Sequence, residues 1–290
     1  MTTDLVSRRQ LLVDGARRGL GGLCSGAALA PAAGDRHVFV WLRGGADALS
    51  LVVPYRNDEY YRARPQTALL PPGRGTGAAL RLTADFGLHP GLAPLLPTFA
   101  EGEASIVWGV GQPTFTASHA EAERALLGAL RRSWGLSAHV TPKGCLGEQL
   151  GTLAARIRSG AAPRVALVEA SGWDTHAAQG RGLQGLLASS VDELACALRD
   201  FRIALGSARR QVRVVVGSEF GRSLRETTLA GTDDGHASLS FVFDTSSRAS
   251  AFVGSVPALG PRELSQGRHL RPTRMLEDLL TSCLASGGRG

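Results

Sequence analysis

The chain has 290 residues, of which 43% are hydrophobic and 20% are charged, proportions that are ordinary for a globular protein with a buried core. The formal charge is +7, but among the 32 basic residues only Lys143 is a lysine, and the arginines after residue 32 are scattered. Because they form no basic stripe with interleaved aromatic residues, we expect no nucleic-acid partner.

The N-terminal segment carries the features of an export signal. Ser7–Leu12 (SRRQLL) is a twin-arginine motif, and a weakly apolar stretch from Gly19 to Ala33 follows it. Ala30 and Ala32 offer a small-residue cleavage site, and the apolar stretch is far shorter than the roughly 20 residues of a spanning helix. We therefore expect residues 1–32 to be a signal peptide that the twin-arginine translocase recognises. This predicts a periplasmic or otherwise exported protein with no stable membrane span. A basic amphipathic starter helix is the alternative.

After residue 32 the chain alternates short apolar runs with helical patterns. In chain order the pattern predicts a strand over 38–42, a polar excursion over 56–77, a short helix over 89–102, a strand over 105–110, helices over 118–132 and 144–159, a strand over 165–168, a helix over 183–205, strands over 212–216 and 239–243, and a helix over 274–284. Such alternation favours an α/β protein with a mostly parallel sheet covered on both faces. With no repeat and no clear linker, residues 33–290 are expected to form a single domain.

Acidic residues and histidines follow several of the predicted strands. Asp174 and His176 come after the strand at 165–168 in the turn SGWDTH, and Asp233, Asp234 and His236 precede the strand at 239–243 in GTDDGH. Open α/β sheets bind ligands beyond the carboxyl ends of their strands, and divalent metals take carboxylate and imidazole ligands from separate segments. The pattern predicts a metal site at this edge.

The spacing Asp-x-His occurs twice in these segments, at Asp174–His176 and at Asp234–His236. In extended backbone, residues i and i+2 face the same side, so one metal ion could bind both side chains of a pair. The alternatives are a helix-capping aspartate with an incidental surface histidine in the first segment, and an ordinary Asp-Gly turn in the second.

Three further residues fit such a site. Asp47 follows the first strand and fits a bridging carboxylate, and Glu219 fits a metal ligand. Arg222 could clamp a tetrahedral anion, because a guanidinium group binds such anions with two hydrogen bonds. Arg222 could equally form an ion pair with Glu226, four residues later.

Ser118 and His119 open the helix predicted over 118–132 and are candidate catalytic residues. A hydroxyl at a helix N-terminus lies in a positive field that stabilises an alkoxide, so Ser118 is a candidate nucleophile. The alternative is structural, since Ser118 and Glu121 have the spacing of a capping box. The chain has no G-x-S-x-G elbow, because Ser218 in GSEFG stands one residue too early.

The ordered motifs resemble those of one known family, the domain of unknown function 1501. After the twin-arginine leader, the motifs are VFVWLRGGADALSLVVPY, YRARP, LHPGLAPLLP, SHAEAE, SGWDTHAAQ, SEFGRSLRE and GTDDGH. The resemblance covers most of the chain from Arg36 to about Val256. That family is exported, bacterial and grouped with the alkaline phosphatase/sulfatase superfamily.

The resemblance implies a three-layer α/β/α sandwich of the alkaline phosphatase kind, with metal ligands at the strand ends. Matched by motif, the ligands would be Asp47, Asp174, His176, Glu219, Asp233 and His236, and Ser118 would occupy the place of the superfamily's nucleophile. The implied activity is metal-dependent hydrolysis of a phosphate or sulfate ester. A non-catalytic envelope protein that uses the fold as a binding scaffold is the alternative.

The chain departs from the family pattern at three positions. Phe220 and Asp234 stand where imidazoles are usual, and Ala117 stands where an arginine precedes Ser-His. A site richer in carboxylates shifts the preference from zinc toward calcium, magnesium or manganese. It also fits a site that is no longer catalytic.

Overall fold

The computed structural model describes residues 36–116, 118–137, 144–245, 252–256 and 258–284. The predicted signal peptide over residues 1–32 and Ala117 lie outside the described residues. Over the described ranges, no helix combines the length and the apolar character needed to cross a membrane.

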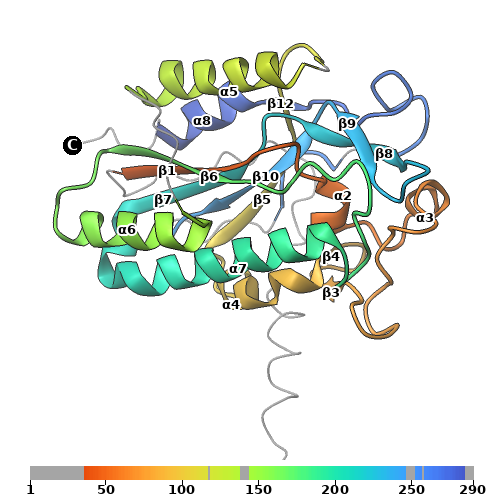
Figure 1. The fold of residues 1–290 in the computed structure, drawn as a ribbon, viewed down its shortest axis with the longest axis horizontal. Coiled ribbons are helices and arrows are strands. Elements are labelled where there is room, and N and C mark those ends of the chain that lie inside the picture. Colours follow the sequence, from red (N-terminus) through yellow and green to blue (C-terminus); the bar gives the residue numbers. More distant parts are fainter. Residues whose placement is uncertain (1–35, 117, 138–143, 246–251, 257, 285–290) are drawn as a thin grey trace, which may run out of the picture.

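A central sheet of seven strands organises the fold (Figure 1). Its order is β11–β5–β10–β7–β1–β6, and β12 pairs with β5 beside this path. The strands are β1 (Arg36–Leu42), β5 (Ala104–Gly111), β6 (Val165–Ala170), β7 (Val212–Gly217), β10 (Ser238–Phe243), β11 (Phe252–Val253) and β12 (Arg274–Met275). β10 is antiparallel to both neighbours, and the other pairs are parallel, so the prediction of a mostly parallel sheet is confirmed.

Helices lie on both sides of this sheet (Figure 1). On one side are α5 (His119–Trp134) and α8 (Leu276–Leu284), and on the other are η1 (Pro90–Leu95), α4 (Leu96–Ala100), α6 (Leu146–Arg158) and α7 (Leu186–Leu205). The remaining helical segments are α2 (Ala48–Leu51), α3 (Asp58–Ala63) and η2 (Gly206–Gln211).

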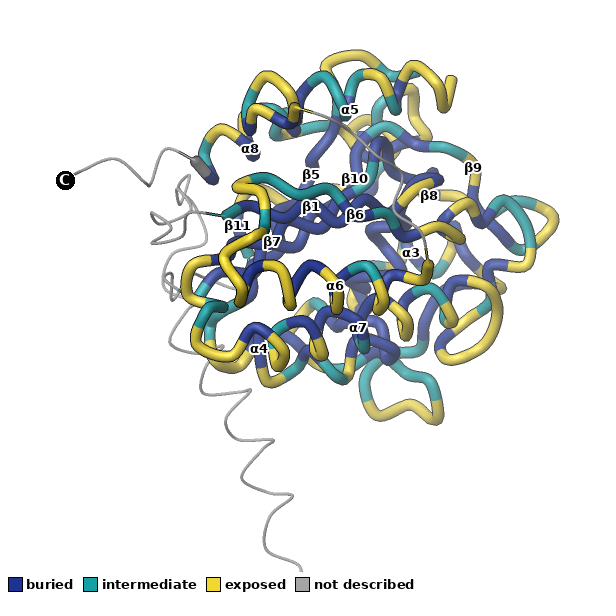
Figure 2. Tube along the Cα trace, turned by 60° about the vertical axis from the view of Figure 1, so that its left-hand side comes forward, coloured by how far each residue is buried: buried dark blue, intermediate teal, exposed yellow. Residues whose placement is uncertain are grey.

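Alternate residues of β1 pack into two different apolar cores. Phe39 and Trp41 join the core that contains side chains of α5 and α8, whereas Val38, Val40 and Leu42 join the core that contains side chains of α6 and α7. All five are buried, because successive side chains of a strand point to opposite faces and both faces are covered. Figure 2 shows the strands buried between helices whose outer surfaces are exposed. This double burial explains why the strands are recognisable as continuous apolar runs.

The structure differs from the expected layout in two polar segments. The sequence around GSEFGR and GTDDGH was expected to form turns and loops, but it forms a hairpin of β8 (Gly221–Glu226) and β9 (Thr232–Gly235). The predicted polar excursion contains α3, whose N-cap Asn57 accepts a hydrogen bond from the backbone N of Glu59 at 2.9 Å. A second small sheet joins β2 (Val52–Val53), β4 (Gly87–Leu88) and β3 (Leu80–Arg81). These strands have two residues each, which is too short to show an apolar period.

The long helix α7 begins at Leu186, three residues later than expected. Gly185 has φ +91° and ψ −178°, which is not helical. The first two N–H groups of α7 bond instead to the preceding loop, since Leu186 N donates to Ala178 O at 3.4 Å and Leu187 N donates to Gln179 O at 3.1 Å. The start of α7 is therefore fixed against the loop that carries His176.

Candidate functional site

Five predicted site residues meet beyond the carboxyl edge of the sheet. β1, β6 and β7 are parallel, so their C-terminal ends lie at one edge, where β8 and β9 also lie (Figure 1). Hydrogen bonds join Arg222 of β8, Asp234 of β9, Asp174 and His176 of the segment after β6, and His119 of α5. We call these five residues the Arg222 cluster.

Arg222 is the buried cation at the centre of this cluster. Its Nη1 donates to Asp234 Oδ1 at 2.6 Å, and its Nη2 donates to Asp174 Oδ1 at 3.1 Å. Nη1 also donates to Gly44 O at 3.2 Å, and Nε donates to Thr232 Oγ1 at 3.3 Å. The guanidinium group is thus held by protein acceptors, so it neutralises two carboxylates rather than projecting into solvent as an anion clamp.

Two partly exposed imidazoles flank these carboxylates. His119 Nε2 lies 2.9 Å from Asp234 Oδ2, and His176 Nε2 lies 3.6 Å from Asp234 Oδ1. His176 Nδ1 also forms a hydrogen bond with Asp174 Oδ1. Burial raises the pKa of Asp174, but His176 and Arg222 outweigh it, so the pKa of Asp174 lies below its usual value. A carboxylate thus orients each imidazole at one nitrogen.

Two glycines after β1 allow the cluster to close. Gly44 has φ +110°, and a Cβ atom there would lie 2.7 Å from Asp174 N. Gly45 has φ +87°, and a Cβ atom there would lie 2.3 Å from the Phe220 ring. Both positions combine a left-handed backbone with a close approach, so they require glycine. The motif RGGAD was a signal for this role, although the prediction used only its aspartate.

That aspartate, Asp47, lies in a separate buried ion pair. Arg64 Nη1 donates to Asp47 Oδ2 at 2.6 Å, and Arg64 Nη2 donates to Asp47 Oδ1 at 2.9 Å. Burial raises the pKa of Asp47, but Arg64 and the hydrogen bonds from Ser50 and Gln179 outweigh it, so the pKa is below its usual value. Sequence reasoning missed the role of Arg64, although it lies in the quoted motif YRARP.

Gln179 connects the Asp47–Arg64 pair to the Arg222 cluster. Its Nε2 donates to Asp47 Oδ2 at 2.8 Å, and its Oε1 accepts from Thr232 Oγ1 at 2.8 Å. Thr232 Oγ1 in turn accepts from Arg222 Nε. Hydrogen bonds through Gln179 and Thr232 therefore connect Asp47 to Arg222 of the cluster.

Glu219 has a comparable supporting position. One carboxylate oxygen accepts from Trp41 Nε1 at 2.7 Å, and the other accepts from Gly44 N at 2.8 Å. The carbonyl of the same Gly44 faces Arg222 Nη1. Glu219 is buried and fixes the turn after β1 rather than meeting Asp174 and Asp234.

Asp233 and His236 also lie apart from the five clustered side chains. Asp233 is exposed, and its backbone N donates to Ser223 Oγ at 3.2 Å. His236 Nε2 lies 3.0 Å from Gln112 O, and its ring packs edge-on against Phe115 at 5.7 Å. Asp234 and His236 therefore share the spacing Asp-x-His but take different partners.

The contacts bear on two of the sequence alternatives. Ser118 is the N-cap of α5, and its hydroxyl accepts from Glu121 N at 3.4 Å, as the structural interpretation predicted. Glu226 accepts instead from Gln66 N and Thr67 N, so the expected ion pair with Arg222 is not formed. The reason is that β8 is a strand, in which residues i and i+4 are far apart.

The predicted metal ligands are not assembled as one set. Within the described part of the chain, no group of three or more His, Cys, Asp or Glu side chains is arranged to hold a metal ion. Asp47 pairs with Arg64, and the two carboxylates of the cluster pair with Arg222. Because a guanidinium group already neutralises each of these carboxylates, the donor set as arranged does not fit a divalent ion.

The cluster borders a cleft of about 950 Å³ that His176, Asp233 and Asp234 help to line. The opposite wall comes from α3 and from the segment around His269. Burial, Arg268 and His236 lower the pKa of His269 below its usual value. The cleft gives a ligand direct access to His176.

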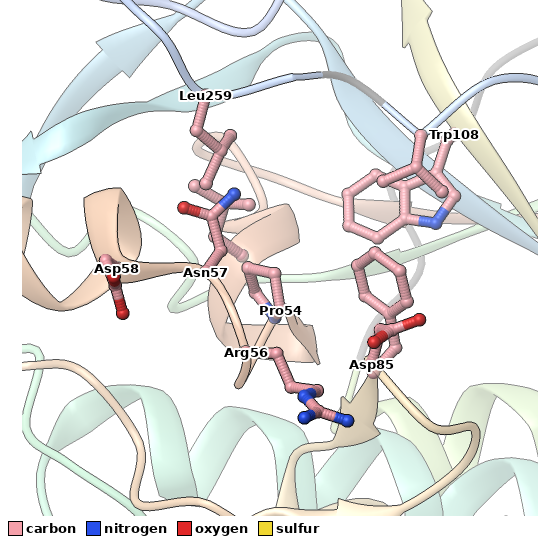
Figure 3. Close-up of a pocket in the computed structure, with 10 residues that line it drawn as sticks. Pro54, Arg56, Asn57, Asp58, Asp85, Trp108 and Leu259 are labelled. Atoms are coloured by element: carbon pink, nitrogen blue, oxygen red, sulfur yellow. The ribbon is translucent and has the colours of Figure 1, made fainter.

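A second cavity of about 390 Å³ has a separate lining (Figure 3). Its lining combines the side chains of Trp108 and Leu259 with the polar side chains of Arg56, Asn57 and Asp85. None of its lining residues belongs to the predicted site.

The fold and the cluster define a class: an α/β protein with a mostly parallel sheet and an imidazole–carboxylate–guanidinium site at the carboxyl edge. Residues 129–272 match the model of the family described as "Protein of unknown function (DUF1501)", which confirms the predicted family. No match was found among curated proteins or among solved structures.

Proposed function

We propose that the chain is an exported hydrolase of phosphate or sulfate esters that uses the Arg222 cluster. One observation carries the proposal: His119 and His176 are each held by a carboxylate at one nitrogen, and they flank the same carboxylate, Asp234, beside the cleft. General acid–base catalysis needs imidazoles that are oriented in this way.

In the proposed reaction, water attacks the phosphorus or sulfur atom of an ester bound in the cleft. One imidazole accepts the proton of the attacking water, and the other protonates the oxygen that leaves as the ester bond breaks. Arg222 is buried, forms ion pairs with Asp174 and Asp234, and holds both carboxylates in place. Ser118 has no part in this mechanism, because its hydroxyl caps α5.

The expectation of a bound divalent metal stays open to direct test. Zinc, calcium, magnesium and manganese were the ions expected from the sequence, and elemental analysis of protein purified without chelators would show whether any is retained. No step of the proposed reaction depends on such an ion. The finer fold assignment, a three-layer α/β/α sandwich of the alkaline phosphatase kind, is likewise part of the proposal.

Purified full-length protein should hydrolyse at least one of p-nitrophenyl phosphate, bis(p-nitrophenyl) phosphate and p-nitrophenyl sulfate. His176→Gln should lower kcat about 100-fold or more, the usual scale of general acid–base catalysis. Thr228→Ala is the matched control, because Thr228 lines the same cleft outside the cluster. Equal activity of His176→Gln and wild type would contradict the assignment.

The second candidate is a non-catalytic envelope protein that binds a ligand in the cleft. It is favoured by Phe220, which stands where the superfamily usually has an imidazole and packs against the His119 ring at 4.9 Å. If wild type hydrolyses none of the three esters, with or without each of the four metals, the scaffold function replaces the hydrolase proposal.

A further inference from the structure

Three of the five large apolar side chains that are most exposed in the described part of the chain lie in two adjoining segments. They are Leu183 (57% exposed), Leu186 (56%) and Leu229 (67%), which we call the leucine patch. The other two, Ile203 and Val256, lie elsewhere. Exposed apolar side chains that gather in one place indicate an interaction surface, whereas isolated ones are normal.

Backbone hydrogen bonds hold the two segments side by side. Ala178 N donates to Leu229 O at 2.9 Å, and Leu186 N donates to Ala178 O at 3.4 Å. Ala178 therefore lies between two of the exposed leucines. Leu183 lies in the turn between Ala178 and Leu186, so all three exposed leucines belong to backbone segments that adjoin one another.

The backbone under the patch is strained at two alanines. Ala178 has φ +49° and Ala230 has φ +53°, a left-handed region that residues with a side chain rarely adopt. The two residues are linked through neighbouring hydrogen bonds, because Gln179 N donates to Ala230 O at 2.9 Å. Strain of this kind persists only where the surrounding structure holds the conformation in place.

Three exposed arginines lie in segments that carry or adjoin the leucine patch. Arg181 lies in the same turn as Leu183, and Arg74 lies in the loop whose Gly77 approaches Gly182. Arg225 precedes the turn that carries Leu229. All three arginines are exposed, and within the described ranges none of them forms an ion pair with an acidic side chain.

The acidic residues of the same segments are already engaged. Asp174 pairs with Arg222 and His176, and Glu226 accepts hydrogen bonds from Gln66 N and Thr67 N. These segments therefore combine exposed leucines with exposed arginines whose charge no acidic side chain of the same segments neutralises. This combination is complementary to the surface of a bilayer that contains anionic lipids, into which leucines insert while arginines contact the headgroups.

We infer that the leucine patch docks the protein on an anionic phospholipid surface, with the strand-end edge of the sheet facing the membrane. The patch is connected to the Arg222 cluster, because Thr227 Oγ1 donates to His176 O at 2.9 Å. Docking would place the mouth of the cleft near the headgroups. The inference does not depend on the proposed hydrolase activity, since its evidence is the exposed surface alone.

The test is co-sedimentation of the full-length protein with vesicles, either phosphatidylglycerol mixed with phosphatidylcholine or phosphatidylcholine alone. Wild type should bind the anionic vesicles, and binding should weaken as NaCl is raised. The variant L183S/L186S/L229S should bind about tenfold or more weakly, because three apolar insertions are lost. The variant R74Q/R181Q/R225Q should lose the preference for anionic vesicles.

Ile203→Ser is the matched control. Ile203 is 71% exposed and lies on the same helix as Leu186, about 25 Å away at 1.5 Å per residue. It should bind vesicles like wild type. Equal loss in Ile203→Ser and in the leucine variant, or no binding of wild type to anionic vesicles, would overturn the inference. If analytical ultracentrifugation shows a dimer that the leucine variant abolishes, while wild type binds no vesicles, the patch is instead a self-association surface.

Discussion

Arg222 and Asp234 occupy directly paired positions of the β8–β9 hairpin, and Arg222 Nη1 donates to Asp234 Oδ1 at 2.6 Å. The same guanidinium group reaches Asp174 in the segment that follows β6. One side chain therefore joins a polar hairpin to the edge of the central sheet. Several measurable consequences follow from this and from the features around it.

Arg222→Met should destabilise the protein by about 3 kcal/mol, because removing one partner of a buried ion pair leaves uncompensated carboxylates. The estimate is at the lower end of the usual range since Asp174 is partly exposed. Arg225→Met on the same strand is the control and should change stability by less than about 0.5 kcal/mol, as exposed substitutions do. Urea unfolding followed by circular dichroism would measure both, and equal effects would contradict the central role of Arg222.

Gly45→Ala should cost more stability than Gly73→Ala. Both glycines have similar backbone angles, φ +87° and φ +81°, so the conformational penalty of alanine is shared and is about 1–2 kcal/mol. Only at Gly45 does the new Cβ meet another group, the Phe220 ring at 2.3 Å, whereas nothing lies within 4 Å of a Cβ at Gly73. The difference between the two melting temperatures isolates the steric effect, and identical melting temperatures would show that the turn after β1 adapts freely.

Ser118→Ala should lower stability by about 0.5–2 kcal/mol, the usual cost of losing a helix cap, and should leave any ester hydrolysis intact. Ser118→Asp keeps a capping oxygen and should recover most of the stability. Thermal unfolding and kcat would be measured on the same preparations. Loss of turnover in a folded Ser118→Ala protein would restore the nucleophile assignment.

The buried His89 should make stability depend on pH in a defined window. Burial lowers the pKa of His89 from 6.5 to about 4, so the neutral form is retained in the folded protein, where Nδ1 accepts from Gly91 N at 3.1 Å. Between pH 6.5 and 4 the unfolded chain binds a proton that the folded chain does not, so the free energy of unfolding falls as pH falls. The total loss is on the order of 3 kcal/mol.

His89→Asn should flatten this part of the curve of stability against pH. The loss below about pH 4 should remain in that variant, because there Asp47 takes up a proton in the unfolded chain while its lowered pKa keeps it ionised in the folded protein. Urea midpoints measured at intervals from pH 7 to about pH 3 separate the two windows. An unchanged slope between pH 6.5 and 4 in His89→Asn would assign that dependence to other groups.

The buried elements could be predicted from the sequence because their physical signal is local. The strand expected over 212–216 is β7 (Val212–Gly217), and the helix expected over 118–132 is α5 (His119–Trp134). A run of valines indicates the strand, and an alanine-rich helical period after a capping residue indicates the helix, so a few consecutive residues suffice for each prediction. The β8–β9 hairpin could not be predicted in this way. Its pairing depends on side chains such as Arg222, whose partners lie 12 and 48 residues away.

The sequence predicted which residues belong to the candidate site better than it predicted the contacts between them. Asp174, His176 and Asp234 do converge, as their positions next to predicted strands suggested. Which carboxylate takes which cation could not be deduced, because Asp47 and Glu219 are also carboxylates that follow predicted strands. Only the fold shows that Arg64 and Trp41 engage them first.

The Asp47–Gln179 hydrogen bond joins residues 132 positions apart in the chain, and Arg64 Nε bonds to Leu224 O across 160 positions. Closing such long loops costs entropy, and contacts of this separation form late in folding. A nascent chain that has not yet produced β8 therefore lacks Leu224, whose carbonyl oxygen accepts from Arg64 Nε, and Arg222, the cation that pairs with Asp174. The Arg222 cluster can therefore form only after residues 222 and 234 have been synthesised. A truncated fragment could contain the early strands and still lack the candidate site.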